Sequence, residues 1–267
     1  MHEQHDLATA RPSGRAVSRD EYAGRDLLTV GSYNIHRCVG MDMRYDVERV
    51  ARVIRELNCD TVGLQEVDCR PRPQTDALQL ELLARATGMQ PIAGTDSLPH
   101  PSVHGNALLT TREFGAVRRH DLTVAGREPR GALDVELHAA GHVVRVIVTH
   151  LGLRPAERRV QVKRLLTVLR GIPPEHPVVV LGDINEWLPI GRPLRWLHRL
   201  LGKAPSQRSF PVWAPTFALD RVWSRPVGAL LALEVHRSPD ARAASDHFPI
   251  KAIVAPDIGR RVHHRFG

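Results

Sequence analysis

Carboxylate, imidazole and amide side chains recur where the apolar segments of this sequence end. Asn34, Glu66 and His150 each end one such segment. The other residues at such positions are Asp183, Asn185, Asp220, Asp246 and His247. Burying a polar group beside an apolar run is costly unless the group is paired, hydrogen-bonded or bound to a metal. Because layered α/β proteins bind ligands at the ends of their strands, we expect these side chains to converge on one site.

These residue types suit the hydrolysis of a phosphoester. A hard divalent cation such as Mg²⁺ prefers carboxylate, water and substrate oxygens, so Glu66 can serve as one firm protein ligand. Histidine titrates near neutrality, and a nearby carboxylate raises its basicity, which favours His247 as the general base. Asp183 and Asp246 could orient the attacking water and the base. Asparagines and a second histidine can donate hydrogen bonds to phosphate oxygens as charge develops.

Short apolar runs, typical of strands that are covered on both faces, extend along the whole chain. We expect strands at 27–35, 61–67, 106–111, 133–138, 143–150, 178–183, 219–223 and 250–254. Ala139, Ala140 and Gly141 separate two of these runs and predict a tight hairpin turn.

Three segments with apolar residues at helical spacing lie between the strands. Asp46 is placed as the N-cap of a helix that ends at Leu57. A second helix is expected over 76–87, with Gly88 as its C-cap, and a third over 155–169, beginning with proline. Strands and helices that alternate in this way predict one layered α/β sandwich.

One domain over residues 26–256 accounts for this organisation, since no linker or internal repeat interrupts it. The first 25 residues mix four Arg with four Asp or Glu and lack the apolar core of a signal peptide, which predicts a disordered tail. Residues 257–267 are expected to form a basic tail. No run approaches the roughly 18 apolar residues of a membrane span. The three cysteines lack metal-site spacing and suit a reducing compartment, so we expect a cytoplasmic protein.

Seven short motifs occur in an order that resembles the endonuclease/exonuclease/phosphatase superfamily. They are Ser32–His36, Leu64–Val67, Gly105–Ala107, Thr149–Leu151, Gly182–Asn185, Leu219–Arg221 and Ser245–His247. A further set, including Glu157–Arg159 and Asn185–Trp187, resembles a bacterial branch of small hydrolases in that superfamily. The resemblance implies a DNase I-like four-layer sandwich, in which two mixed β-sheets pack face to face and helices cover them. It also implies dependence on Mg²⁺ or Mn²⁺.

The same resemblance suggests a role for each motif residue. Glu66 would bind the metal, with Asn34 and Asp246 as further candidate ligands. Asp246 would also hold and polarise His247, while Asp183 would orient or deprotonate the attacking water. The residues expected to contact the phosphate or other parts of the substrate are His150, Asn185, Asn106, Asp220 and Arg130. His247 and Asp183 both remain candidates for the group that activates water.

Two polar residues outside the catalytic motifs have ordinary alternatives. Arg130 precedes a predicted strand and could clamp a phosphate, or it could pair with Glu128. His104 is expected to be a surface histidine or a satisfied core histidine.

The chain carries a net charge of +8, and its basic residues are clustered. Segment 154–170 has six basic residues and one acid, and segment 192–208 has five and none. Such clusters attract nucleic acid or an anionic membrane surface, although they can also be solvated surface. Leu194, Leu197 and Leu201 lie at helical spacing, so a basic amphipathic helix could rest on a membrane or pack on the sandwich.

These observations favour a metal-dependent phosphodiesterase or phosphatase. Its substrate could be a phospholipid headgroup or a small phosphodiester, and the alternative is a nuclease that acts on DNA. Asp68 after the glutamate motif would discourage close approach of a DNA backbone. A catalytically silent scaffold with the same fold is disfavoured, because every expected catalytic position is filled.

Overall fold

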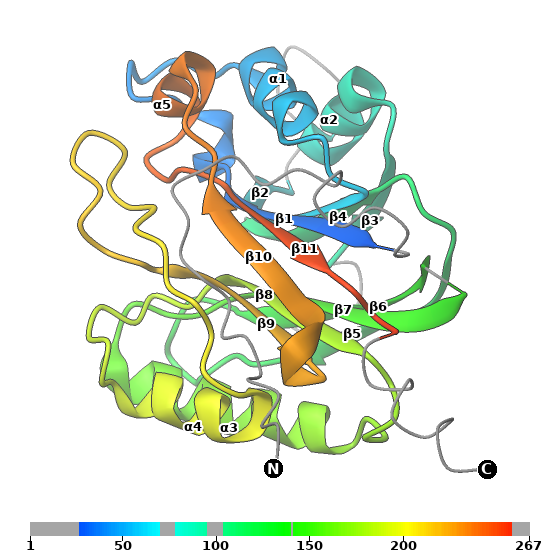
Figure 1. Ribbon diagram of the computed structural model, residues 1–267. Helices are drawn as coiled ribbons and strands as arrows, with labels where there is room; N and C mark the ends of the chain where they lie inside the picture. The colour runs from blue at the N-terminus through cyan, green and yellow to red at the C-terminus, as the bar shows by residue number, and fades with distance from the viewer. Residues whose placement is uncertain (1–26, 70–77, 95–103, 140, 258–267) are drawn as a thin grey trace, which may run out of the picture.

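Two β-sheets lie face to face between two layers of helices in the computed structural model, which describes residues 27–69, 78–94, 104–139 and 141–257 (Figure 1). The first sheet contains β1 (Leu28–Asn34), β2 (Thr61–Asp68), β3 (Gln90–Ala93), β4 (His104–Thr110), β10 (Leu230–Val235) and β11 (Ile250–Val254). Their order is β10-β11-β1-β2-β4-β3. The second sheet contains, in order, β5 (Phe114–Asp121), β6 (Gly131–Ala139), β7 (His142–His150), β8 (Val178–Asp183) and β9 (Asp220–Arg225).

The two sheets share a core of aliphatic side chains. Val30 and Leu108 of the first sheet pack in one buried cluster with Val146 and Leu181 of the second. Side chains alternate along each strand, so Ile147 points to the opposite face of the second sheet from Val146. Both faces of the central strands are therefore buried, which explains their nearly continuous apolar sequences.

Helices cover the outer face of each sheet (Figure 1). Helices α1 (Val47–Leu57), α2 (Gln79–Thr87) and α5 (Pro239–Ala244) lie on the first sheet, and α3 (Pro155–Arg170) and α4 (Arg192–Leu201) lie on the second. Two 3₁₀ turns, η2 (His36–Cys38) and η3 (Val227–Ala229), complete the described elements. The predicted four-layer α/β sandwich is confirmed.

Local signals in the sequence mark several helix ends correctly. The Asp46 side chain accepts a hydrogen bond from the Arg49 amide at 2.9 Å and caps α1. Gly88 ends α2 with a positive φ of 69°. Pro155 begins α3, as expected. Three strands are additional to those predicted, namely β3, β5 and β10. The predicted tail at 1–25, the predicted tail at 257–267 apart from Asp257, and the predicted start of α2 at Asp76 lie outside the described residues.

The basic helix predicted within 192–208 exists as α4, but its apolar face is not available to a membrane. Leu194, Leu197 and Leu201 are buried against the second sheet, in a cluster that includes Trp223. Packing on the sandwich is therefore the correct alternative, because the sheet buries the same leucines that a membrane would need. Among the described residues, no helix is long and apolar enough to cross a membrane.

Candidate active site

The predicted site residues meet at one edge of the sandwich. Asn34, His150 and Asp183 are the last residues of β1, β7 and β8. Strand register places Asp183 between His150 on one side and Asp220, the first residue of β9, on the other. His247 lies just before β11, which runs antiparallel to β1 and so begins where β1 ends. The topology thus brings together residues that are far apart in the sequence.

Glu66 reaches this edge because β2 is interrupted. The pairing of β2 with β4 shifts register between Leu64 and Val67, and Glu66 has a left-handed φ of 59°. A β-bulge adds a residue to one strand and redirects its side chain, and bulges are common beside active sites. A left-handed conformation is costly for a residue with a side chain, so the surrounding structure must impose it.

The end of β8 has a similarly unusual backbone. Gly182 has a φ of 143°, and a Cβ atom there would lie 1.8 Å from the carbonyl oxygen of Thr149, so only glycine fits. Asn185, three residues on, has a φ of 51°. These conformations aim Asp183 and Asn185 into the site.

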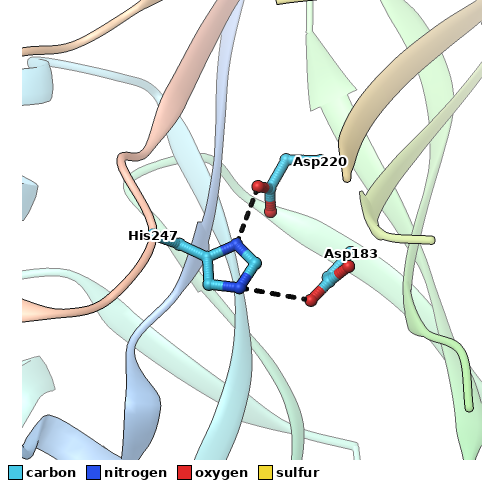
Figure 2. A group of neighbouring side chains, drawn as sticks. All are labelled: Asp183, Asp220 and His247. Carbon is cyan, nitrogen blue, oxygen red and sulfur yellow. Dashed lines mark hydrogen bonds and ion pairs between the residues drawn. The ribbon is translucent and has the colours of Figure 1, made fainter. Parts of the chain in front are cut away.

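His247 is held between two buried carboxylates (Figure 2). Its Nδ1 atom is 2.9 Å from Oδ2 of Asp220, and its Nε2 atom is 3.7 Å from Oδ2 of Asp183. Asp220, and not the predicted Asp246, is the hydrogen-bond partner of the imidazole, while the charge of Asp246 also raises the pKa of His247. Asp246 and His247 lie in a bend before β11, and the hydrogen-bond partner of His247 comes from the start of β9.

The charges around His247 bear on the choice between His247 and Asp183 as the general base. Burial lowers the pKa of the imidazole, but the carboxylates of Asp220 and Asp183 outweigh that effect and raise it to about 10. Burial raises the pKa of Asp183 to about 6, with Asp220 acting in the same direction and His247 against it. At neutral pH the pair therefore consists of an imidazolium and a carboxylate, so Asp183 is the better proton acceptor.

Three residues that position this pair were not identified from the sequence. The Ser209 hydroxyl donates a hydrogen bond to Oδ2 of Asp220. The Ser245 hydroxyl donates to the Asn34 carbonyl oxygen at 2.7 Å and accepts from the His247 amide at 3.2 Å. The ring of Phe210 packs on that of His247, with centroids 4.6 Å apart. Ser245 was visible in its motif, and Phe210 belongs to the set of residues that resembles the small-hydrolase branch, whereas Ser209 lies in neither.

Asn34 connects the carboxylates of Glu66 and Asp183. Its Nδ2 atom donates to Oε1 of Glu66 at 3.1 Å and to Oδ2 of Asp183 at 3.2 Å. Its Oδ1 atom accepts from the His36 amide at 3.1 Å. In this orientation the Asn34 amide presents N–H groups to the two acids, so it must rotate before its oxygen can reach a cation.

The acidic groups of the site have the composition of a divalent metal site. Glu66 is partly exposed, and it shares the Asn34 amide with Asp183, so two carboxylates face one small region. Hard cations such as Mg²⁺ prefer such oxygen ligands. Asp183, Asp220 and His247 also offer ligand atoms within 4.8 Å of one another. In that second group, however, both ring nitrogens of His247 are directed at carboxylates, which is typical of hydrogen bonding. Glu66 is therefore the better centre for a metal, while Asp246 as a ligand stays a prediction.

His150 and Asn185 form a buried pair beside Asp183. The Asn185 amide donates to the Leu151 carbonyl oxygen at 2.8 Å and lies 3.0 Å from Nε2 of His150. Burial, together with the positive charge of Arg130, holds the pKa of His150 well below its ordinary value, so this imidazole is neutral. A neutral ring whose Nε2 accepts a hydrogen bond carries its proton on Nδ1.

The comparisons with known proteins agree with this arrangement. The sequence profile described as the Endonuclease/Exonuclease/phosphatase family matches residues 31–247. The chain belongs to this family. Members of the endonuclease/exonuclease/phosphatase family are generally hydrolases. The matched range includes every predicted site residue, from Asn34 to His247.

Relatives and solved structures of family members show the extent of the similarity. The uncharacterized protein YbhP of Escherichia coli K12 is 29% identical over 241 residues, covering 82% of this chain and 92% of YbhP. A family structure from Beutenbergia cavernae is 24% identical, with a TM-score of 0.68, covering 87% of this chain and 72% of that one. TDP2 of D. rerio, solved with a single-strand DNA product, is 17% identical, with a TM-score of 0.63. The match covers 85% of this chain and 98% of the TDP2 chain. These structures confirm the DNase I-like fold.

Charged residues of this family member also surround Glu66 and His150. Glu128 accepts from Arg130 at 2.8 Å and lies 3.2 Å from Nδ1 of His104. The pairing of Arg130 with Glu128, one of the two alternatives, is thus present, and Arg130 still acts electrostatically on His150. Burial lowers the pKa of His104, and the negative charges of Glu128 and Glu66 oppose this effect. His104 is therefore close enough to Glu66 to respond to its charge, unlike an ordinary surface histidine.

The remaining predicted substrate residue, Asn106, has a structural contact. Its Nδ2 atom donates to the Gly131 carbonyl oxygen at 2.8 Å and ties β4 of one sheet to β6 of the other. Its buried Oδ1 atom accepts no hydrogen bond from the described residues. Contact between Asn106 and a substrate stays a prediction.

Proposed function

We propose that this chain is a divalent-metal-dependent phosphoester hydrolase that cleaves a phosphodiester with an activated water. The arrangement of Asp183 carries the proposal. Its Oδ1 atom accepts a hydrogen bond from the backbone N–H of Asn185 at 2.9 Å, which fixes the carboxylate. Its Oδ2 atom lies 3.2 Å from Nδ2 of Asn34, 3.5 Å from Nε2 of His150 and 3.7 Å from Nε2 of His247. A buried carboxylate oriented in this way can act as a general base.

Glu66 would hold the metal, Mg²⁺ or Mn²⁺, with the Asn34 oxygen as a further ligand after rotation of the amide. A divalent cation so held supplies positive charge to the phosphate oxygens and orients the phosphoryl group. The carboxylates that face the Asn34 amide support this assignment, because they are hard oxygen donors placed together at the edge of the site.

The protein's own residues account for the proton movements. Asp183 takes a proton from water as the water oxygen bonds to phosphorus, and the P–O bond to the leaving group breaks. The imidazolium of His247, held by Asp220, stabilises the negative charge that develops on the phosphoryl oxygens. Asn185 orients the neutral His150, which would contact the phosphate by hydrogen bonding. Each step needs only a group at the shared edge of the two sheets.

The substrate we favour is a phospholipid headgroup or another small phosphodiester. Asp68 directly follows the bulged segment that carries Glu66, and an acid at this position does not favour a nucleic-acid backbone. A nuclease is the second candidate, supported by the positive net charge and by the DNA product bound to the similar TDP2 structure.

A substrate panel tests the proposal. Purified protein with Mn²⁺ should hydrolyse a bis-aryl phosphodiester, and a chelator should stop the reaction. DNA, RNA, phospholipids and inositol phosphates, tested in parallel, then separate the two candidates. Glu66→Ala and His247→Ala should each lose most of the activity, while Glu175→Ala, an exposed acid beyond α3, should retain it. Absence of hydrolysis of every substrate with either metal would reject the proposed activity.

A further inference from the structure

Three loops at the site edge expose large apolar side chains to solvent. Leu153 lies in the loop after β7, and Trp187, Leu188 and Ile190 follow β8. Trp213 and Phe217 lie before β9. We call these six residues the apolar rim. Their exposed fractions reach 63% at Leu188, 72% at Trp213 and 78% at Ile190, which is unusual for a folded domain outside an interaction site.

Ring contacts and hydrogen bonds hold the three loops together. The Trp187 ring packs edge-on against Phe217, with centroids 4.7 Å apart, and against Phe210 at 5.7 Å. Arg158 of α3 donates to the carbonyl oxygens of Gly152 and Leu153 and also to the Glu186 carboxylate at 3.3 Å. The loops that carry the apolar rim are therefore neighbours: Arg158 joins the first two, and the Trp187 ring joins the second to the third.

The ion pair of Arg158 and Glu186, which supports the first two loops, is buried. Only 2% of Arg158 and 5% of Glu186 is exposed. The other carboxylate oxygen of Glu186 accepts from the Leu188 amide at 3.2 Å. A Cβ atom on Gly152 would lie 2.1 Å from the Glu157 carboxylate, so a larger residue there would displace that side chain. The fold thus holds Leu153 and Leu188 outward instead of letting the loops collapse onto the core.

The charge around the apolar rim indicates what it contacts. Segment 187–219 contains five Lys or Arg and no Asp or Glu. An exposed arginine stands within two residues of a rim or rim-supporting residue in each loop: Arg154 beside Leu153, Arg192 after Ile190, and Arg208 before Phe210. Arg195 and Arg199 extend this charge along the outer side of α4, whose leucines face inward.

We propose that the apolar rim and its flanking arginines dock on an anionic lipid bilayer. Apolar side chains beside arginines match the boundary between acyl chains and negatively charged headgroups, and tryptophan is enriched at that depth. The rim loops directly follow His150 and Asp183 or precede Asp220, so docking turns the catalytic edge toward the headgroups. Binding to the bilayer requires no hydrolysis, so it stands apart from the proposed reaction.

Vesicle sedimentation with the full chain tests the proposal. The protein should bind mixed phosphatidylcholine–phosphatidylglycerol vesicles and bind phosphatidylcholine vesicles much less. The double variant Leu188→Ser, Ile190→Ser should lower the partition coefficient by about tenfold or more, since it removes two apolar anchors. Arg154→Glu with Arg192→Glu should abolish the preference for anionic lipid.

Matched control substitutions lie at the far end of the second sheet. Val143, near the start of β7, and Val227, just after β9, are also exposed, but they are at the opposite ends of these strands from His150 and Asp220. Val143→Ser with Val227→Ser should leave vesicle binding unchanged. Thermal unfolding of both double variants checks that each is folded.

Two results would overturn the proposal. One is equal binding of the rim variant and the wild-type chain to anionic vesicles. The other is no vesicle binding by the wild-type chain, whether or not the rim variant raises the KM for a soluble phosphodiester. A raised KM without vesicle binding would assign the rim to an apolar part of the substrate. Neither result affects the proposed hydrolysis, which is measured with a soluble bis-aryl phosphodiester.

Discussion

His247 directs Nδ1 at the carboxylate of Asp220, with 2.9 Å between Nδ1 and Oδ2. Both side chains are buried, and the Ser209 hydroxyl donates to the same carboxylate oxygen. The hydrogen bond at Nδ1 consequently fixes the orientation of the imidazole, and its Nε2 atom is directed toward Asp183. A histidine held in this way keeps its orientation and its positive charge at neutral pH.

Replacing Asp220 should therefore impair the chemical step. Asp220→Asn removes the charge that stabilises the imidazolium, and we expect kcat to fall by about 10²- to 10⁴-fold. Glu175→Gln is the control, since it removes an exposed charge beyond α3. Steady-state kinetics with a bis-aryl phosphodiester measure both. An unchanged kcat in Asp220→Asn would contradict the assignment of Asp220.

The pH dependence of kcat/KM distinguishes the two candidate bases. Asp183 must be deprotonated to accept a proton, and burial raises its pKa to about 6, so activity should increase as the pH passes through that value. His247 acts as a cation with a pKa of about 10, held there by Asp220 and Asp183 against the effect of burial, so activity should decrease above that pH. A neutral His247 acting as base would instead make activity rise through its own pKa. That rising limb is the outcome that would return the role to His247.

Metal binding should stabilise the folded protein through Glu66. Any ligand that binds only the folded state raises the unfolding temperature, by an amount that grows with its concentration over its Kd. Mg²⁺ or Mn²⁺ should therefore raise the Tm of the wild-type chain, and Glu66→Ala should abolish most of that rise. Glu175→Ala, at an exposed site remote from Asn34, should retain it. An unchanged metal-dependent shift in Glu66→Ala would show that the cation binds elsewhere.

The buried Arg158–Glu186 pair should matter for stability. Glu186→Gln leaves a buried guanidinium without its carboxylate partner, and we expect a loss of about 3–5 kcal/mol in the free energy of unfolding. Denaturant titration measures this loss. Replacing both residues with methionine should restore part of it, because no unpaired charge then remains. Wild-type stability in Glu186→Gln would show that the backbone carbonyl oxygens alone satisfy Arg158.

The strands that the sequence did not reveal have a common position in the fold. β3, β5 and β10 each lie at an edge of their sheet, whereas all of the central strands were predicted. Central strands are buried on both faces and have apolar sequences, but an edge strand such as β5, Phe114–Asp121, is largely exposed. β3 contains Pro91, which is tolerated at an edge because it donates no hydrogen bond.

The site could be predicted as a set of residues but not as a set of partners. Strand ends correctly indicated that Asn34, His150 and Asp183 share one edge. His247 pairs with Asp220, which is 27 residues away in the sequence, because the fold brings the two together. From the sequence alone, the adjacent Asp246 looked like the natural partner. The bulge that aims Glu66 is likewise a property of pairing between strands. The pKa values that favour Asp183 over His247 as the base depend on burial and neighbouring charges in the folded protein.

The order of strands sets when the site can form during synthesis. The second sheet is built from one continuous stretch, 114–225, whereas the first sheet needs β1 from the start of the described chain and β11 from its end. β11 lies between β10 and β1, and His247 immediately precedes it. A chain emerging from the ribosome therefore carries Asn34, Glu66 and Asp183 long before it carries the imidazole that completes them. Hydrolysis has to wait until the last strand is inserted beside the first.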